Sequence, residues 1–298
     1  MIGLRQSLSV VGYNFRHWHK NARIIVVFAL AFILCFLLTD KAVQFAQEHD
    51  TTIQLVEPFI WSFGDSDSIL LMSLLLILLF ADIPFLSSGT PLYLMRMTRR
   101  RWVMGQLFYT IAATALFLIF ILASTILICI KQSYVGDLWS ETAAILGYSG
   151  AGKAIVLPSL VKTLEMSFPY RCMFTIYCLM LGYAMVLVFI MLVFSLWKGA
   201  AAGILSGFVF SVYGFLLKPS TIEALFKLPA ELYYKANVAV GWLSPLNQAT
   251  YHMHNFGYDR LPRMEQSFMI FGLLLLLGFI LAQFAIRHYN FVFTGTEG

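Results

Sequence analysis

Charged residues are scarce in this chain. Asp, Glu, Lys and Arg make up 12% of its 298 residues, about half of their usual share, whereas the apolar set AVILMFWYC makes up 60%. A soluble fold of this size has too little interior to bury that much apolar surface. The composition therefore excludes an ordinary soluble enzyme and indicates a protein that resides in a lipid bilayer.

Cysteine is also rare, and no Cys-x-x-Cys pair is present. Zinc sites and extracellular disulfide frameworks both depend on regularly spaced cysteines, so neither is expected. The four cysteines lie in or beside apolar runs, at Cys35, Cys129, Cys172 and Cys178. We expect buried free thiols that pack as small apolar side chains.

Uncharged runs of membrane-spanning length recur along the sequence. A hydrocarbon core about 30 Å thick requires roughly 20 helical residues. Windows of that order predict six transmembrane helices, at about 24–45, 68–87, 102–130, 172–196, 200–217 and 267–286. No charge lies deep inside any window, which argues against an ion-coupled transporter with an intramembrane relay. The predicted fold is an all-α integral membrane protein whose single transmembrane domain covers residues 1–298.

Lys and Arg are distributed unevenly between the connecting segments. Residues 1–23 carry basic side chains and no acidic one, whereas residues 40–67 are mainly acidic. The positive-inside rule therefore places both termini and the loop 84–102 in the cytosol. Because the basic residues cluster at the ends of apolar runs, we expect a bilayer and not a nucleic acid as the partner of this charge. The predicted outer loops are 46–67, 131–171 and 218–266.

The first 23 residues have a helical apolar periodicity. Apolar side chains recur every three or four residues, at Leu4, Leu8, Val11, Phe15 and Trp18. This spacing predicts an amphipathic helix that lies at the cytosolic membrane interface. The alternative is a basic leader without fixed structure.

One segment resembles a phosphate-binding loop. Residues 147–153 fit the pattern G-x-x-x-x-G-K, but Ala154 stands where the motif needs Ser or Thr to hold magnesium. No buried strand is predicted before it, and the orientation places it outside the cell. We interpret it as a glycine-rich turn.

Two histidines suggest either a catalytic site or a metal-binding site. His254 and Asp259 have the His-x-x-x-x-Asp spacing of membrane acyltransferases, in which the Asp orients a His base. His252 and His254 would suit a metal ion if the segment were extended. Since no second acyltransferase motif and no third ligand lies nearby in the sequence, a polar lip at the membrane surface with Tyr251 and Asn255 is the favoured interpretation.

Small residues recur every four positions along the fifth predicted span, at Gly199, Gly203, Gly207 and Ser211. Such a strip lets another helix approach closely. The strip predicts either a subunit or gating interface or ordinary packing within one bundle, and the sequence leaves both open.

The loop 84–102 contains a helix-start signal. Thr90 is suited to cap a helix and Pro91 to occupy its first turn, so residues 92–97 are predicted to form a short helix before an arginine cluster. In the alternative interpretation, the arginines only anchor the ends of the second and third spans.

The layout resembles the type 2 ABC-transporter permease family. The resemblance rests on the six spans, the basic amphipathic first helix and the segment Pro91-Leu-Tyr-Leu-Met-Arg96-Met-Thr-Arg99-Arg-Arg-Trp102. The segment Trp242-Leu-Ser-Pro245 is similar to the part of the family in which short re-entrant or interfacial helices lie near the outer mouth, before the last span. In that family the cytosolic loop is a coupling helix that docks in a cleft of a separate ATPase. The resemblance thus implies an ATPase contact through Pro91, Tyr93, Leu94, Arg96, Arg99 and Arg100.

The resemblance also implies a function. It implies a transporter of two permease chains, the same or related, and two ABC ATPases in the inner membrane of a bacterium, which exports an amphipathic compound such as a peptide, antibiotic or lipid-like molecule. ATP and Mg²⁺ would bind to the ATPases, and no cofactor to this chain. Two alternatives remain. A secondary transporter or channel predicts intramembrane charges or broken helices in paired halves, and a membrane-bound acyltransferase-like enzyme predicts a denser polar cluster than His254 and Asp259 supply.

Overall fold

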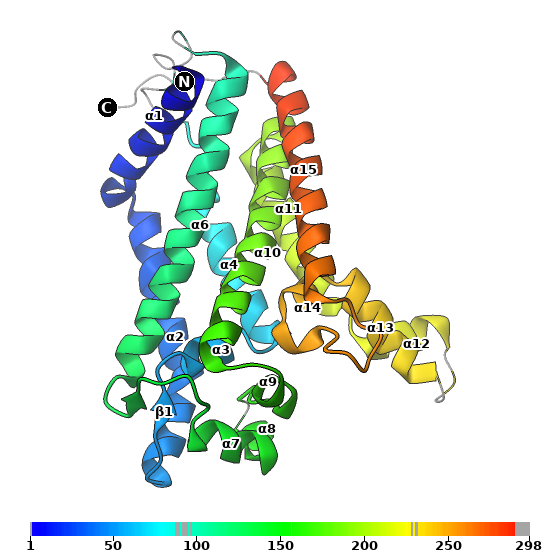
Figure 1. The fold of residues 1–298 in the computed structure, drawn as a ribbon. Helices are drawn as coiled ribbons and strands as arrows, with labels where there is room; N and C mark the ends of the chain where they lie inside the picture. The colour runs from blue at the N-terminus through cyan, green and yellow to red at the C-terminus, as the bar shows by residue number, and fades with distance from the viewer. Residues whose placement is uncertain are drawn as a thin grey trace.

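Long apolar helices run side by side through the molecule (Figure 1). The computed structural model describes residues 2–86, 90, 95, 97–155, 157–227, 229 and 232–289. Four of its helices are long and apolar enough to cross a membrane: α2 (Ala22–Glu48), α6 (Arg99–Cys129), α10 (Pro169–Lys198) and α15 (Met264–His288). Each matches a predicted window and extends beyond it by a few residues at one or both ends.

The other two predicted spans differ from the windows. The helix α11 (Ala200–Leu216) is followed after two residues by α12 (Pro219–Phe226) at an angle of 78°, so the pair makes a fifth span only if the bent pair is counted as one. The helix α4 (Ser66–Leu79) has 14 residues and rises about 21 Å, less than the core thickness. It ends at Leu79, and Pro84 prevents a helix from running through the rest of the window, because a proline has no N–H to continue the helix and disfavours helical geometry at the residue before it. By length and composition, the described helices supply four possible spans, or five if the bent pair is counted as one. The arrangement of six spans stays a prediction.

Helix α10 is the central element of the bundle. It packs against α11, α15, α6 and the short α3 (Glu57–Ser62), and most of its side chains are buried. Its link to α11 is the single residue Gly199, with φ of 92°, a left-handed conformation that an L side chain rarely adopts. The two helices are consequently antiparallel neighbours with no loop between them.

The first helix, α1 (Ile2–Arg16), docks on α6 through a face that overlaps the predicted stripe. Val11 and Phe15 of that stripe pack against the core, as does Trp18 just after the helix, whereas Leu8 is 52% exposed. Among the residues of α1 whose burial is described, the most buried are Ser7, Val10 and Asn14. A Cβ on Gly105 of α6 would lie 2.7 Å from Val10 Cβ, so the close approach of the two helices depends on that glycine. Ser7 Oγ donates to the backbone oxygen of Arg101 at 3.0 Å. The 3₁₀ helix η1 (Trp18–Lys20) then leads into α2.

The predicted outer loops contain much local structure. Strand β1 (Ile53–Gln54) pairs in parallel with β2 (Ser133–Tyr134), and the residue partners are Ile53 with Ser133 and Gln54 with Tyr134. The other short elements are α7 (Glu141–Tyr148), α8 (Ala151–Ala154), α9 (Val161–Met166), α13 (Tyr233–Leu243), α14 (Pro245–Ala249) and η3 (Tyr251–Met253). They lie at the end of the bundle opposite the start of α1 (Figure 1).

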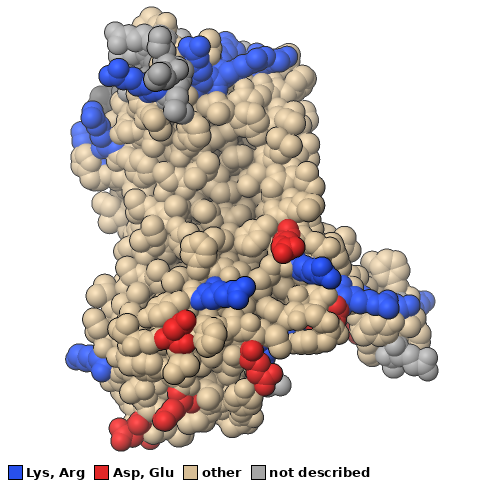
Figure 2. Space-filling view, in the orientation of Figure 1, with Lys and Arg blue, Asp and Glu red and all other residues tan. Residues whose placement is uncertain are grey.

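Charge is distributed unequally between the two ends. Figure 2 shows Lys and Arg side chains gathered at the end where α6 begins and α15 ends, with no Asp or Glu among them on the face shown. The Asp and Glu side chains visible on that face all lie in the opposite half, where Lys and Arg are found as well.

Candidate functional site

The predicted coupling segment is described only in part. Pro91, Tyr93, Leu94 and Arg96 lie outside the described residues. Arg99 and Arg100 form the first turn of α6, where Arg99 Nη1 donates to the backbone oxygen of Tyr289, just beyond α15, at 3.1 Å. This hydrogen bond links the start of α6 to the residue that follows α15.

The small-residue strip of α11 faces its own chain. A Cβ on Gly203 would collide with the Ser195 side chain and lie 2.7 Å from the carbonyl oxygen of Met191, and a Cβ on Gly207 would lie 2.8 Å from Met191 Cγ. Ser211 is buried as well. The described contacts are thus the packing of α11 on α10 within one bundle, and Gly199 forms the turn between these helices. Contact of the strip with a second chain stays a prediction.

The phosphate-loop match has a different geometry from a nucleotide site. Gly147 lies in the last turn of α7, and residues 151–154 form the short α8, so the segment is a turn between two helices. A Cβ on Gly147 would lie 2.7 Å from Leu164 Cδ1 of α9. This glycine allows helix packing, and no strand leads into the segment.

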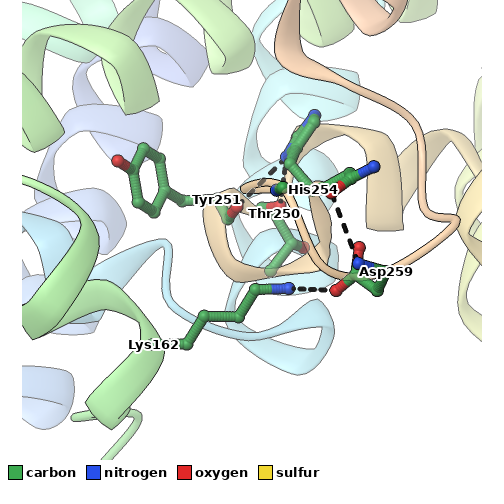
Figure 3. A network of polar contacts seen from close by, with 7 residues as sticks. Lys162, Thr250, Tyr251, His254 and Asp259 are labelled. Carbon is green, nitrogen blue, oxygen red and sulfur yellow. Dashed lines mark hydrogen bonds and ion pairs between the residues drawn. The ribbon is translucent and has the colours of Figure 1, made fainter.

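His254 is fully buried and is surrounded by hydrogen-bond partners (Figure 3). Its Nδ1 lies 3.1 Å from the carbonyl oxygens of Thr250 and Tyr251, and its Nε2 lies 3.0 Å from Ser267 Oγ. Burial lowers the pKa of His254, which favours the neutral ring. Because both ring nitrogens make hydrogen bonds, the side chain links the η3 segment to the start of α15.

Asp259 pairs with Lys162 of α9 and makes no described side-chain hydrogen bond to His254 (Figure 3). Lys162 Nζ lies 2.9 Å from Asp259 Oδ2, and it also lies 5.3 Å from the ring centroid of Phe256 and 5.6 Å from that of Tyr258. The acyltransferase spacing is therefore present in the sequence, but the Asp does not orient the His. The cluster stabilises the loop before α15 instead.

A mixed polar and apolar cavity of about 510 Å³ lies beside this cluster. Its walls come from the start of α4, the bend between α11 and α12, and the helices α13, α14 and η3. The polar lining side chains are Asp65, Ser66, Lys218, Ser220, Asn237, Asn247, Thr250 and His252, and the apolar ones include Phe215, Val240 and Met253. Such a cavity is suited to a molecule with a polar group and an apolar body.

His252 lines the cavity in its neutral form. Burial and the positive charge of Lys162 lower the pKa of His252 to about 4, although Asp65 opposes the shift. At neutral pH the ring is thus a hydrogen-bonding group without charge. The charged side chains of the cavity lining are Asp65 and Lys218.

A second buried polar cluster centres on Glu57, the first residue of α3. Its carboxylate accepts from Gln54 N at 3.1 Å, from Ser140 N at 2.7 Å and from Ser140 Oγ at 2.6 Å. Burial raises the pKa of the Glu57 carboxyl to about 7, because desolvation outweighs the three hydrogen bonds that favour the charged form. The cluster joins β1, α3 and the start of α7.

Sequence reasoning identified His252 and the outer segment 242–245, but it missed the cavity, Glu57 and the partner of Asp259. An acidic residue directly before Pro58 and an apolar helix is the local signal that would have drawn attention to Glu57. Among the described residues, no group of three or more His, Cys, Asp or Glu side chains is arranged to hold a metal ion.

No family model, no curated protein sequence and no solved structure matches the chain. The functional interpretation therefore rests on the residues and their arrangement.

Proposed function

We propose that this chain is the membrane-spanning permease subunit of an ATP-driven transporter of the type 2 ABC class. In this proposal two such chains, the same or related, assemble with two separate ATPase subunits in the inner membrane of a bacterium. ATP and Mg²⁺ bind to the ATPases, and the complex exports an amphipathic compound such as a peptide, antibiotic or lipid-like molecule.

The observation that carries the proposal is the concentration of Lys and Arg at one end of the helix bundle (Figure 2). The start of α1, the start of α6 and the end of α15 meet at this end, so the proposed topology makes it cytosolic. The segment that resembles a coupling helix leads directly into α6. An ATPase in the cytosol would therefore reach this segment.

The interior of the long helices supports a separate energy source. Neither described ion pair, Arg23 with Asp82 or Lys162 with Asp259, lies deep inside one of them. Ion-coupled transporters usually place acidic or basic groups near the bilayer midplane. This arrangement is consistent with ATP hydrolysis on a separate ATPase subunit, whose conformational change would reach this chain through the coupling segment.

The outer end supports an amphipathic substrate. The helices α13 and α14 pack against each other, and α14 also packs on α10, α11 and α4. They border the cavity that combines Asp65 and Lys218 with apolar walls. In the proposed transporter these helices are interfacial or re-entrant, and they cover the outer mouth.

The deciding experiment is purification of the tagged full-length chain from the membranes of its own host. We expect a co-purifying subunit that carries G-x-x-x-x-G-K-[ST] and hydrolyses ATP. The variant Tyr93→Ala with Leu94→Ala should reach the membrane normally and lose at least ten-fold in recovered ATPase, since aromatic and apolar anchors dominate small interfaces.

A charge-conserving variant separates coupling from anchoring. Replacing Arg96, Arg99 and Arg100 by Lys keeps the charge that sets orientation but removes the planar guanidinium donors. The matched control is the replacement of Arg171, Arg260 and Arg263 by Lys at the opposite end. Full ATPase recovery with the first variant and the double Ala variant would show that the loop is only an anchor.

A further inference from the structure

A groove runs between the start of α6 and the end of α15. It has a volume of about 470 Å³ and is lined by Arg100, Arg101, Met104, Phe279, Ile280, Gln283, Phe284 and Arg287. The arginines belong to the first turn of α6 and the last turn of α15. The mouth of the groove is therefore basic, and the lining contains no acidic side chain.

The positive charge of the groove is not neutralised within the described part of the chain. The ion pairs among the described residues, Arg23 with Asp82 and Lys162 with Asp259, involve none of the three arginines. Arg101 Nη1 donates to Gln6 Oε1 at 2.9 Å, which positions the side chain but leaves its charge. The start of α6 adds the partial positive charge of a helix N-terminus, where Thr98 makes no side-chain cap. The groove thus favours an anion.

Away from the arginines, toward the middle of α15, the wall of the groove is apolar. Ile280, Phe284 and Arg287 are spaced four and three residues apart on α15, so they lie along one face of that helix. Phe284 is 60% exposed and Ile280 is 55% exposed, and the apolar wall extends about 10 Å from Arg287 along the helix. A soluble acidic protein surface would leave these side chains without an apolar partner. A phospholipid supplies a phosphate for the arginines and acyl chains for the wall.

We infer that this groove binds an anionic phospholipid of the cytosolic leaflet. The headgroup phosphate accepts hydrogen bonds from the arginines, and the first carbons of the acyl chains lie on Phe284 and Ile280. Basic pockets between transmembrane helices are known sites of this kind, and Arg is suited to planar recognition of phosphate. The inference rests on the proposed orientation of the chain but not on the proposed ATPase partner.

The test is a titration of the delipidated full-length chain in detergent, in which native mass spectrometry counts bound phosphatidylglycerol. Phosphatidylcholine with the same acyl chains is the reference lipid. Each arginine near a membrane surface adds about five-fold to the affinity for an anionic lipid. We expect Arg287→Gln to weaken phosphatidylglycerol binding about five-fold, and Arg100→Gln with Arg287→Gln to weaken it about 25-fold. Phosphatidylcholine, whose phosphate charge is balanced by its quaternary ammonium group, should bind more weakly to the unchanged protein and lose less affinity in these variants than phosphatidylglycerol does.

The matched control is Arg171→Gln with Arg260→Gln, which removes the same charge from exposed positions at the other end. Equal losses in this control and the groove variant, or equal binding of the two lipids by the unchanged protein, would overturn the inference. Displacement of phosphatidylglycerol by inorganic phosphate alone would reduce the groove to a simple anion site and would also overturn it.

Arg287 separates this inference from the proposed function, because it lies on α15 and outside the loop 84–102. If Arg287→Gln keeps phosphatidylglycerol but loses a co-purifying ATPase, the groove is a protein contact and the lipid inference is wrong. If phosphatidylglycerol binding falls as expected while no ATPase is ever recovered, the lipid site stands and the proposed function fails.

Discussion

The two ends of the molecule treat their charged groups differently. Where α6 begins, three arginines line a groove that contains no described carboxylate. At the opposite end, the buried and half-buried ionisable groups have close partners. Glu57 accepts three hydrogen bonds there, and Lys162 contacts Asp259 at 2.9 Å. A polar group whose partners lie inside the chain contributes to the fold, and a charge without a described partner is available to orient the protein or to bind an external anion. The two ends should therefore respond differently to the removal of a charge.

The largest expected effect is on stability at the end that contains Glu57. Glu57→Ala leaves the N–H of Gln54 and both donors of Ser140 without their acceptor in a buried site. We expect a loss of about 4 kcal/mol in the free energy of unfolding, since each unsatisfied buried donor costs about 1–3 kcal/mol and such costs are not fully additive. Thermal unfolding of the purified protein in detergent measures this loss.

The matched variant at the basic end is Arg100→Gln. Because this side chain is exposed, its removal should change stability by less than about 0.5 kcal/mol. Equal destabilisation by the two variants would contradict the division between a satisfied end and an unpaired end.

The second effect is a pH dependence with two opposing contributions. The pKa of Glu57 rises from 4.5 to about 7 on folding, so its contribution to stability falls as the pH rises from 4.5 to 7, by about 3 kcal/mol at most. The pKa of His252 falls from 6.5 to about 4, so its contribution falls as the pH drops from 6.5 to 4. Between pH 4.5 and 6.5 the two contributions oppose each other.

Single variants should separate these contributions in thermal unfolding measured from pH 4 to 8. In His252→Asn, the fall in stability that Glu57 causes between pH 4.5 and 7 should be larger than in the unchanged protein, because only His254, whose pKa is also lowered, still opposes it. In Glu57→Gln, stability should rise with pH from 4 to 6.5. Parallel profiles in the two variants would show that neither group titrates as its surroundings indicate.

The smallest effect is the coupling of the outer ion pair. A double-mutant cycle with Lys162→Met and Asp259→Asn should give an interaction energy of about 1 kcal/mol, because both side chains are partly shielded, with exposures of 21% and 29%. The same cycle on Arg23 and Asp82, where the Asp side chain is 37% exposed, should give less. A larger coupling for the more exposed pair would reverse the comparison.

The long helices were predictable from the sequence because each follows from a local run of apolar residues. The window at 24–45 falls within α2, and the window at 102–130 falls within α6 except for its last residue. The window at 68–87 was too long because hydropathy alone ignores the geometric effect of Pro84. The length of an apolar run thus predicts that a helix exists better than it predicts where the helix ends.

The contacts between distant segments were not predictable in the same way. The close approach of α1 to α6 depends on Gly105, far away in the sequence, and the apolar periodicity of α1 alone included Leu8, which is exposed, and omitted Val10, which is buried. Glu57 meets Ser140, which lies 83 residues later. His254 and Asp259 show the converse: they are only five residues apart in the sequence, but their side chains contact different partners, Ser267 and Lys162.

The single-residue link at Gly199 also has a consequence for biosynthesis. Since nothing but one glycine separates α10 from α11, no polar loop has to be accommodated between these two apolar helices. The two helices are therefore able to form a hairpin whose buried contacts are made before α15 is synthesised.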